Sequence, residues 1–346
     1  MAMKEKRMLG AQGVSWRQAF LPGLVKTGIL SGLILVLSGC VSIQLGGGTD
    51  EPLKEQTVET REGASKKVLL VSIDGMIANE PDSGLLRQRP GLIDRVMMQL
   101  RKAEQDPDVV AVVLRINSPG GGVTASDVLY RELQRFRIKT GKKLVVQMMN
   151  VAASGGYYVA LAADEIYAHP TTLTGSVGVI SLTADVTGLT EKLGVTVHTH
   201  KSGEKKDVGS PFRAHQPEDD AYWQALIDQM ATRFYGLVKA RRSLSPEALD
   251  AVKTARVYLG QEAASIGLVD AVSYLPETLA RACKLGGASG CNTVAYRFET
   301  NPNANRYSPG MTTPYAPSLT LLPDLRLGQR WLKPGHYYLY WAEEAF

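Results

Sequence analysis

Short apolar runs alternate with segments of helical hydrophobic spacing through the middle of this chain of 346 residues. The runs Val68–Ile73 and Val109–Ile116 consist almost entirely of Val, Leu, Ile and Ala. A strand that is apolar at nearly every position is buried on both faces, as strands are in a parallel sheet covered by helices. The alternation therefore predicts an α/β fold of successive βα units around a mostly parallel sheet.

The same alternation continues along the chain beyond these two runs. Ser245 precedes Pro246, so we expect Ser245 to cap a helix whose first turn accepts proline. Apolar residues at helical spacing predict the other helices, and short β-branched runs predict the other strands. Besides the helix after Ser245, the expected helices are residues 90–104, 124–136, 154–163, 187–193 and 217–242, and the further strands are residues 143–149, 165–168 and 195–200.

The first 39 residues carry most of the excess positive charge. They hold five Lys and Arg residues against one Glu, whereas the whole chain has a formal net charge of +5. The 13 apolar residues Thr27–Gly39 are fewer than the about 20 that a membrane-spanning helix needs. This pattern predicts a secretory signal, with an N-terminal membrane anchor or a buried helix as the alternative. Because the rest of the chain is near neutral, no nucleic-acid partner is expected.

The leader ends in Leu37–Cys40, which resembles the lipobox of bacterial lipoproteins. We therefore expect cleavage before Cys40, lipidation of its thiol, and a membrane-anchored protein on the extracytoplasmic or periplasmic side of a bacterial membrane. Residues 40–67 lack apolar periodicity and are expected to form a linker.

After Cys40 the chain contains only Cys283 and Cys291, eight residues apart. A disulfide between them is plausible in an oxidising compartment, and two unpaired thiols are the alternative. The chain has no CxxC or HExxH motif, so neither a metal nor another cofactor is expected.

Two small-residue loops follow predicted strands. Asn117–Val123 contains three consecutive glycines before a helix, which suits an anion at a helix N-terminus or simply a tight turn. It lacks the spacing of a Walker or dinucleotide loop. Val151–Tyr158 places Ser154 among Ala and Gly at a strand-to-helix turn, the arrangement of a nucleophile elbow. A small-residue helix packed closely on the sheet is the alternative.

A serine nucleophile needs a base, and the five histidines offer no triad-like context. His198 and His200 alternate on a predicted strand, and His215 lies in a polar loop. Lys206, in the segment Lys205–Arg213, is the stronger candidate, because burial can lower the pKa of a lysine toward neutrality. A solvated surface is the ordinary interpretation of such a lysine pair.

Five motifs follow one another along the chain: Arg115–Gly122, Ala152–Tyr158, Thr174–Gly178, Lys206–Arg213 and Arg256–Asp270. In this order they resemble the signal peptide peptidase SppA family in its short, single-repeat form. The resemblance covers about Val68 to Leu285 and implies a ClpP/crotonase-like spiral of βα units.

The resemblance implies a serine endopeptidase with a Ser/Lys dyad. Ser154 would be the nucleophile, Lys206 the general base, and Ser176 the second serine that helps to orient the lysine. The N–H groups of Gly155 and of Gly120 or Gly121 would form the oxyanion hole.

The resemblance also implies partners. Members of the family assemble as rings or domes in which a neighbouring protomer can contribute to the site, and they degrade peptides, notably cleaved signal peptides in the membrane. The expected organisation is a leader at 1–39, the linker, a peptidase domain at 68–287 and an irregular Tyr- and Pro-rich tail at 288–346. The alternatives are a catalytically inactive scaffold lipoprotein and a crotonase-type acyl-CoA enzyme.

Overall fold

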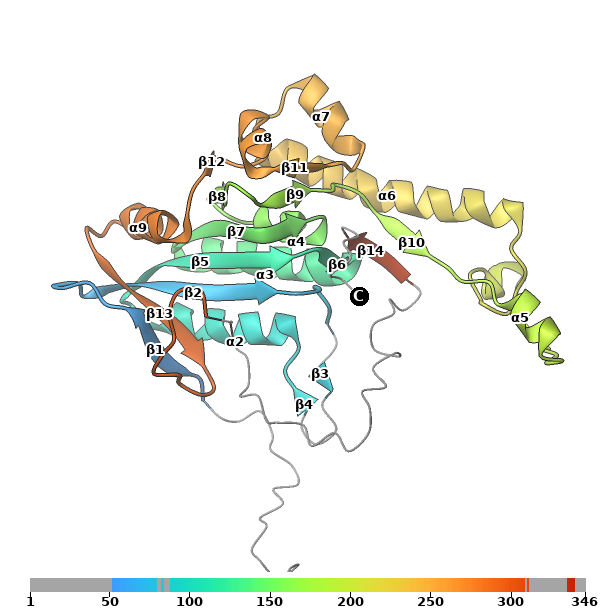
Figure 1. Cartoon of the computed structure of the whole chain (residues 1–346), viewed down its shortest axis with the longest axis horizontal. Helices are drawn as coiled ribbons and strands as arrows, with labels where there is room; N and C mark the ends of the chain where they lie inside the picture. The colour runs from blue at the N-terminus through green and yellow to red at the C-terminus, as the bar shows by residue number, and fades with distance from the viewer. Residues whose placement is uncertain (1–51, 80–81, 84–87, 309, 311–334, 340–346) are drawn as a thin grey trace, which may run out of the picture. The chain divides into compact units, whose positions relative to one another are not determined.

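One mixed sheet with helices on both faces organises the computed structural model (Figure 1). The structure describes residues 52–79, 82–83, 88–308, 310 and 335–339, without the side chains of 82–83, 88–89 and 335–339. All of these residues belong to one compact unit, Gly48–Phe346. The leader and Cys40 lie outside the described residues.

The strands of the central sheet are mostly parallel. Only the pairs β1–β13 and β9–β11 are antiparallel, and the pairs formed by β2, β5, β7, β8 and β12 are parallel. The predicted α/β class with a mostly parallel sheet is therefore confirmed. The strands run in the order β1 (Lys54–Glu59), β13 (Cys291–Arg297), β2 (Lys66–Asp74), β5 (Val109–Ser118), β7 (Lys143–Ala153), β8 (Glu165–Ala168) and β12 (Ala271–Val272). Two further strands lie off this path: β9 (Leu173–Gly175) pairs with β7, and β11 (Val257–Leu259) pairs with β9.

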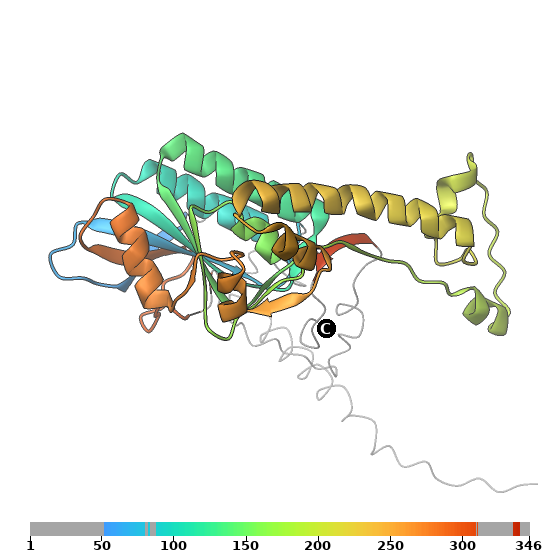
Figure 2. The same ribbon diagram turned by 90° about the horizontal axis from the view of Figure 1, so that it is seen from above.

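Both faces of this sheet are buried. In β2, Leu69 and Val71 join the larger hydrophobic cluster, whereas Val68 and Leu70 join a second cluster on the opposite face. Helices α2 (Leu92–Gln105), α3 (Val123–Thr140) and α4 (Gly155–Ala160) contribute to the larger cluster, and α9 (Leu275–Leu285) covers the other face (Figure 2). This two-sided burial is why the strand sequences are apolar throughout.

The sheet extends beyond the expected peptidase domain at both ends. Strand β1 lies within the expected linker, and β13 lies within the expected tail. Strand β1 is an edge strand made mostly of polar residues, so it gives no apolar signal. A disulfide joins Cys283 of α9 to Cys291 of β13 and so holds the helix on the end of this strand.

A long excursion follows the core strands. It comprises β10 (Ile180–Leu182), α5 (Thr187–Lys192), the 3-10 helix η1 (Glu204–Asp207) and α6 (Pro217–Arg241), before α7 (Pro246–Lys253) and α8 (Gly260–Ser265). The Ser245 side chain accepts a hydrogen bond from the Ala248 N–H, as its capping role predicts. The predicted strand at residues 195–200 is wrong: this segment is exposed and irregular, because no neighbouring strand pairs with it.

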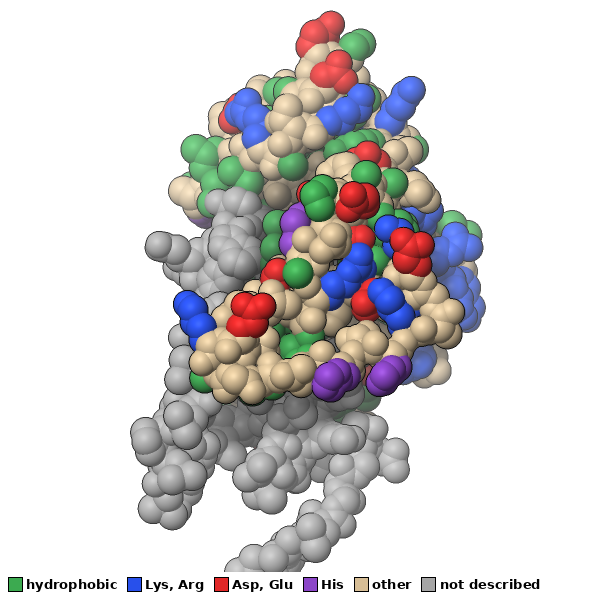
Figure 3. All heavy atoms as spheres, turned by 90° about the vertical axis from the view of Figure 1, so that its right-hand side faces the viewer, with side chains coloured by type: hydrophobic (Ala, Val, Ile, Leu, Met, Phe, Trp, Pro, Cys, Tyr) green, Lys and Arg blue, Asp and Glu red, His purple; other side chains and the backbone are tan. Residues whose placement is uncertain are grey.

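We call residues 183–216, between β10 and α6, the arm. Its apolar side chains Leu193, Val195 and Phe212 are exposed. Viewed from the arm side, charged side chains of both signs mix with hydrophobic ones (Figure 3). The arm therefore has little hydrophobic core of its own.

A smaller sheet stands beside the central one. It has the order β10–β14–β6, in which β6 is Gly120–Gly122 and β14 is Gly335–Leu339. The two-residue strands β3 (Asp82–Ser83) and β4 (Gln88–Arg89) pair separately. Across the described segments, no helix combines the length and apolar character needed to cross a bilayer.

Candidate active site

Ser154 lies at the sharp turn between β7 and α4. Its backbone has φ 50° and ψ −114°, a combination that residues with a side chain rarely adopt. Its N–H donates to the Gly175 carbonyl at 2.8 Å, and the Tyr158 N–H donates to the Ser154 carbonyl at 2.8 Å. The surrounding hydrogen bonds thus hold the strained turn, which has the geometry of a nucleophile elbow.

Ser176 lies beside this turn. Strand β9 pairs with β7 so that Gly175 is opposite Ala153, and the two serines directly follow these paired residues. Ser176 also has a positive φ of 49°, and its N–H donates to the Arg256 carbonyl at 2.9 Å. The Ser154 hydroxyl lies 3.5 Å from the Gly178 carbonyl, at the long limit of a hydrogen bond.

The predicted oxyanion donors differ in which backbone N–H groups are already paired. Gly155 is the first residue of α4, so its N–H has no acceptor within the helix. The N–H of Gly120 donates to the Ser118 hydroxyl at 3.1 Å, and the N–H of Gly122 donates to the Ile77 carbonyl at 2.9 Å. Successive N–H groups of a strand point to opposite edges, so the N–H of Gly121 points away from Ile77 and toward β14.

The backbone of the glycine segment Gly120–Gly122 lies very close to the backbone of Ile77. A Cβ on Gly121 would lie 2.1 Å from the Ile77 carbonyl oxygen, and Gly120 has a φ of 113°. These two positions require glycine for steric reasons. Gly156 is similarly close to a neighbouring backbone, since a Cβ added there would lie 2.9 Å from the Ser118 carbonyl oxygen.

Lys206 is not part of this cluster within one chain. It lies in η1 of the arm, and its side chain is exposed, whereas Ser154 is 1% exposed. Figure 1 shows α5 and the rest of the arm beyond the end of β10, away from α4. The structure thus brings together Ser154, Gly155 and Ser176, but not Lys206.

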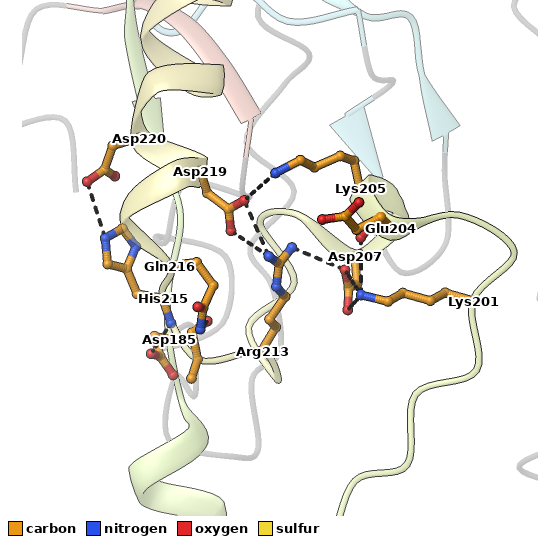
Figure 4. A network of polar contacts seen from close by, with 11 residues as sticks. Asp185, Lys201, Glu204, Lys205, Asp207, Arg213, His215, Gln216, Asp219 and Asp220 are labelled. Carbon is orange, nitrogen blue, oxygen red and sulfur yellow. Dashed lines mark hydrogen bonds and ion pairs between the residues drawn. The ribbon is translucent and has the colours of Figure 1, made fainter.

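The backbone around Lys206 is fixed by an ion-pair network (Figure 4). Arg213 lies between Asp207, at 3.1 Å, and Asp219, at 3.0 Å. Lys205 lies 3.6 Å from Asp219, and Lys201 lies 2.9 Å from Asp207. The hydrogen bond from Lys201 holds the pKa of Asp207 below its usual range. The neighbours of Lys206 are therefore engaged in pairs, while Lys206 points to solvent.

His198, His200 and His215, the histidines considered above as bases, lie on the arm. His198 and His200 are exposed on the arm, and His215 lies 3.3 Å from the Asp220 carboxylate at the start of α6 (Figure 4). Across the described residues, no group of three or more His, Cys, Asp or Glu side chains is arranged to hold a metal ion.

Sequence reasoning did not identify several residues that position the turn. Tyr158 on α4 donates to Asp127 on α3 at 2.6 Å, and Arg233 on α6 donates to the same carboxylate at 2.7 Å. Tyr157 donates to the Leu268 carbonyl at 2.8 Å. These partners are 31 to 111 positions apart in the chain, so no local pattern reveals them.

Several known proteins are similar to this chain over a large part of its length. The family model described as peptidase family S49 matches residues 137–289. A protein of Enterococcus faecium named for signal peptide peptidase SppA is 34% identical over 261 residues, which cover 75% of each chain. Protease 4 of Salmonella typhi is 37% identical over 200 residues, 57% of this chain and 32% of that protein.

Two further comparisons are more distant. The chloroplastic serine protease SPPA of Arabidopsis thaliana is 32% identical over 190 residues, 55% of this chain and 28% of that protein. Among solved structures, a membrane-bound stomatin-specific protease mutant is 17% identical, with a TM-score of 0.39 over 70% of this chain and 96% of that one. That TM-score is too low to establish a shared fold. The identity to the Enterococcus faecium protein, extending over three quarters of both chains, shows that this chain belongs to peptidase family S49, the SppA family that its motifs predict.

Proposed function

We propose that this chain is a membrane-associated serine endopeptidase that uses a Ser154/Lys206 dyad on extended peptides, including cleaved signal peptides. The single observation that carries the proposal is the strained turn at Ser154. A positive φ at a non-glycine residue costs about 1–3 kcal/mol, and such strain is concentrated at active sites. A turn that served only to pack α4 on the sheet could use glycine at this position.

The separation of Ser154 and Lys206 indicates that the base comes from a neighbouring copy. Ser154 is buried in the core of one chain, and Lys206 lies on its arm with an exposed side chain. Exposed apolar side chains on the same arm, including Leu193 at 68% and Val195 at 52%, suit contact with a second copy. Burial there would also desolvate Lys206 and favour its neutral form.

In the proposed reaction, the serine is acylated and then released by water. Neutral Lys206 takes the hydroxyl proton of Ser154 as the serine oxygen attacks the scissile carbonyl. The N–H groups of Gly155 and Gly121 stabilise the oxyanion, and losing one such donor typically costs about 10²–10³ in rate. Protonated Lys206 gives its proton to the leaving amine. Water then hydrolyses the acyl ester, which releases the carboxylic acid product and restores Ser154.

The proposed location rests on the leader. Lipidation at Cys40 would anchor the peptidase on the extracytoplasmic side, where its substrates would be peptides near the membrane. The intact mass of the protein extracted from membranes tests this part: a mass beginning at acylated Cys40 is expected. A mass that still includes residues 1–39 would contradict it.

Labelling with a fluorophosphonate tests the nucleophile. The probe should attach to the intact chain and not to Ser154→Ala. An inactive scaffold predicts no labelling of either chain, and an acyl-CoA enzyme predicts activity that is independent of Ser154. Lys206→Ala should abolish peptide cleavage, whereas its neighbour Lys205→Ala, a matched loss of charge, should retain it. Cleavage by purified Lys206→Ala would overturn the dyad.

Mixing two inactive variants tests the shared site. A Ser154→Ala chain still has Lys206, and a Lys206→Ala chain still has Ser154. If the dyad forms between copies, co-assembly at equal amounts should restore activity at about a quarter of the sites, because each site draws its two residues independently. A mixture that stays as inactive as its components would show that both residues act within one chain.

A further inference from the structure

Strand β7 contains a bulge a few residues before the nucleophile. Before the bulge, Ile116 of β5 is opposite Met148 of β7, and after it Ser118 is opposite Ala152. A single residue of β5 therefore lies beside three residues of β7, Met149–Val151. The two extra residues make β7 locally longer than the strand that it pairs with.

The bulge sets the level at which β7 ends. Because a parallel strand rises about 3.3 Å per residue, the two extra residues draw the end of β7 back by about 6.6 Å relative to β5. Ser154, at the end of β7, is therefore held next to the glycine segment that follows β5. The main chains approach closely here, since a Cβ added to Gly156 would lie 2.9 Å from the Ser118 carbonyl oxygen.

Strand β7 also changes its neighbour at the bulge (Figure 1). Up to Met148 it pairs with β8, and from Val151 onward it pairs with β9. The residues of a bulge fall outside the regular ladder of main-chain hydrogen bonds. Their buried polar groups need other partners, and side chains on both edges of β7 supply them.

Thr172 binds the bulge on the edge that faces β8 and β9. Its side chain is fully buried and lies one residue before β9. The hydroxyl donates to the Met149 carbonyl and lies 3.1 Å from the Met148 carbonyl. Two residues later, the hydroxyl of Thr174, also fully buried, donates to the Ala152 carbonyl at 2.7 Å. Thr172 thus bonds to the bulge itself, and Thr174 to the strand after it.

Asn117 binds the bulge on the edge that faces β5. Its side-chain oxygen accepts a hydrogen bond from the Val151 N–H at 3.2 Å. Its own carbonyl accepts a hydrogen bond from the Gly75 N–H at 2.9 Å, and the chain continues through Ser118 into the glycine segment. Asn117 therefore connects the main chain that carries the nucleophile to the main chain that carries the predicted oxyanion donor.

We propose that Thr172 and Asn117 are positioning residues for catalysis: from opposite edges of β7, they hold the bulge that sets where the Ser154 hydroxyl lies. The inference rests on the proposed function, because the position of Ser154 matters for catalysis only if Ser154 is the nucleophile. A misplacement of about 1 Å can lower a rate about 10²-fold. Loss of either hydrogen bond should therefore slow acylation and have little effect on peptide binding.

Two buried threonines form a matched pair for the test. Thr172 and Thr278 are both fully buried, and both hydroxyls donate to groups of β7. Thr278 extends from α9 to the Gln147 side chain, which precedes the bulge. Thr172→Val and Thr278→Val should both unfold at a lower urea concentration than the parent chain, because each leaves a buried acceptor without its donor.

The steady-state kinetics of the two variants should differ. Thr172→Val should lower kcat for a fluorogenic peptide at least about tenfold and keep KM within about twofold of the parent value. Thr278→Val should keep both constants at the parent values. Thr172→Ser retains the hydroxyl and should restore kcat, whereas a structural role alone predicts equal kcat for the two valine variants and would overturn the inference.

The rate of fluorophosphonate labelling separates position from folding. Asn117→Leu removes the acceptor on the other edge of β7 with little change in size. Asn117→Leu and Thr172→Val should both reach the same labelled fraction as the parent chain, but at least about tenfold more slowly. Labelling of both variants at the parent rate, or at the parent rate to a lower final fraction, would overturn the inference.

The parent chain distinguishes this inference from the proposed function. If the parent is labelled at Ser154 and the variants react equally fast, the peptidase stands and the bulge does not position its nucleophile. If the parent itself is not labelled, the proposed function fails and the inference fails with it.

Discussion

Strain and close packing at single residues mark the site more clearly than any side-chain pair does. Ser154 and Ser176 both have φ near 50°, and they directly follow the ends of the paired strands β7 and β9. Gly121 is forced to be glycine by the Ile77 carbonyl. Substitutions can measure the effect of each feature on the free energy of unfolding. Glycine in place of a serine removes the strain of a positive φ, whereas alanine in place of Gly121 adds a methyl group where there is no space for it.

Replacing Ser154 separates strain from chemistry. Both Ser154→Ala and Ser154→Gly should lose fluorophosphonate labelling, because both lack the hydroxyl. Only glycine adopts φ 50° and ψ −114° without strain, so Ser154→Gly should be more stable than Ser154→Ala by about 1 kcal/mol. Urea unfolding of the two variants measures this difference. Equal stability would mean that the turn is not strained in solution.

The glycine loop offers a matched pair of substitutions. Gly121→Ala places a Cβ 2.1 Å from the Ile77 carbonyl oxygen, so β6 must shift, and we expect a loss of at least about 2 kcal/mol together with activity. The Cβ of Gly122→Ala would lie 3.6 Å from the Ala125 Cβ and 3.9 Å from the Ile77 carbonyl oxygen, both ordinary contacts, so this variant should be tolerated. Melting temperatures and peptide cleavage rates check both. Similar behaviour of the two variants would contradict the packing argument.

Elements around the site are tied together by polar side chains that bridge distant parts of the chain. Arg241 at the end of α6 donates to the carbonyls of Leu161 at 2.9 Å and Ala163 at 2.7 Å, which follow α4. On the opposite face, Arg281 of α9 donates through Nε to the Glu165 carboxylate of β8 at 2.9 Å. These contacts set where α4 and α9 lie on the sheet.

The Glu165–Arg281 pair predicts a pH dependence. The hydrogen bond from Arg281 holds the pKa of Glu165 below its usual value. The pair therefore stabilises the fold fully above the unfolded-state pKa of about 4.3, and this contribution is lost as the pH falls through the lower folded-state pKa. Glu165→Gln should be less stable than the parent chain at pH 7, and the difference should shrink toward zero under acid conditions.

Urea unfolding at several pH values between 7 and 3 measures this difference. Asp250→Asn is a suitable control, because its side chain is 75% exposed and pairs only with Lys253 within α7. That variant should show little change from the parent at any pH. A difference for Glu165→Gln that grows on acidification would contradict the assigned sign.

At the scale of the whole molecule, the proposed dyad is divided between two parts of the chain. The core carries Ser154 with its strained backbone, and the arm carries Lys206 and exposed apolar side chains. An arm with so little burial of its own gains stability when another surface covers it. Assembly and catalysis should therefore be lost together when the arm is changed.

Two equally exposed apolar residues test this coupling. Leu193 on the arm is 68% exposed, and Ile138 on α3, outside the arm, is 73% exposed. Leu193→Glu should lower the oligomer mass in light scattering and reduce peptide cleavage at least about tenfold, because a buried carboxylate opposes association. Ile138→Glu should leave both unchanged. Normal assembly of Leu193→Glu would remove the arm from the proposed interface.

The sequence alone determined the elements whose signal is local. Strand β5 is predictable because apolar residues fill most of it, and the turn at Ser154 is predictable because small residues follow an apolar strand. The helix cap at Ser245 is also local, because the Ser245 side chain accepts a hydrogen bond from the Ala248 N–H three residues later. These features depend on interactions within a few residues, so the order of residues is enough to reveal them.

Tertiary structure decided the features that depend on distant partners. The polar edge strand β1 exists because β13 pairs with it, and β14 forms because β6 and β10 bind it on both edges. The predicted strand at 195–200 is absent because nothing pairs with it. Likewise, motif order placed Ser154 and Lys206 in one site, but the fold puts one in the core and the other on the arm. Hydrogen bonds across a sheet join residues far apart in sequence, so only the folded chain determines which of them form.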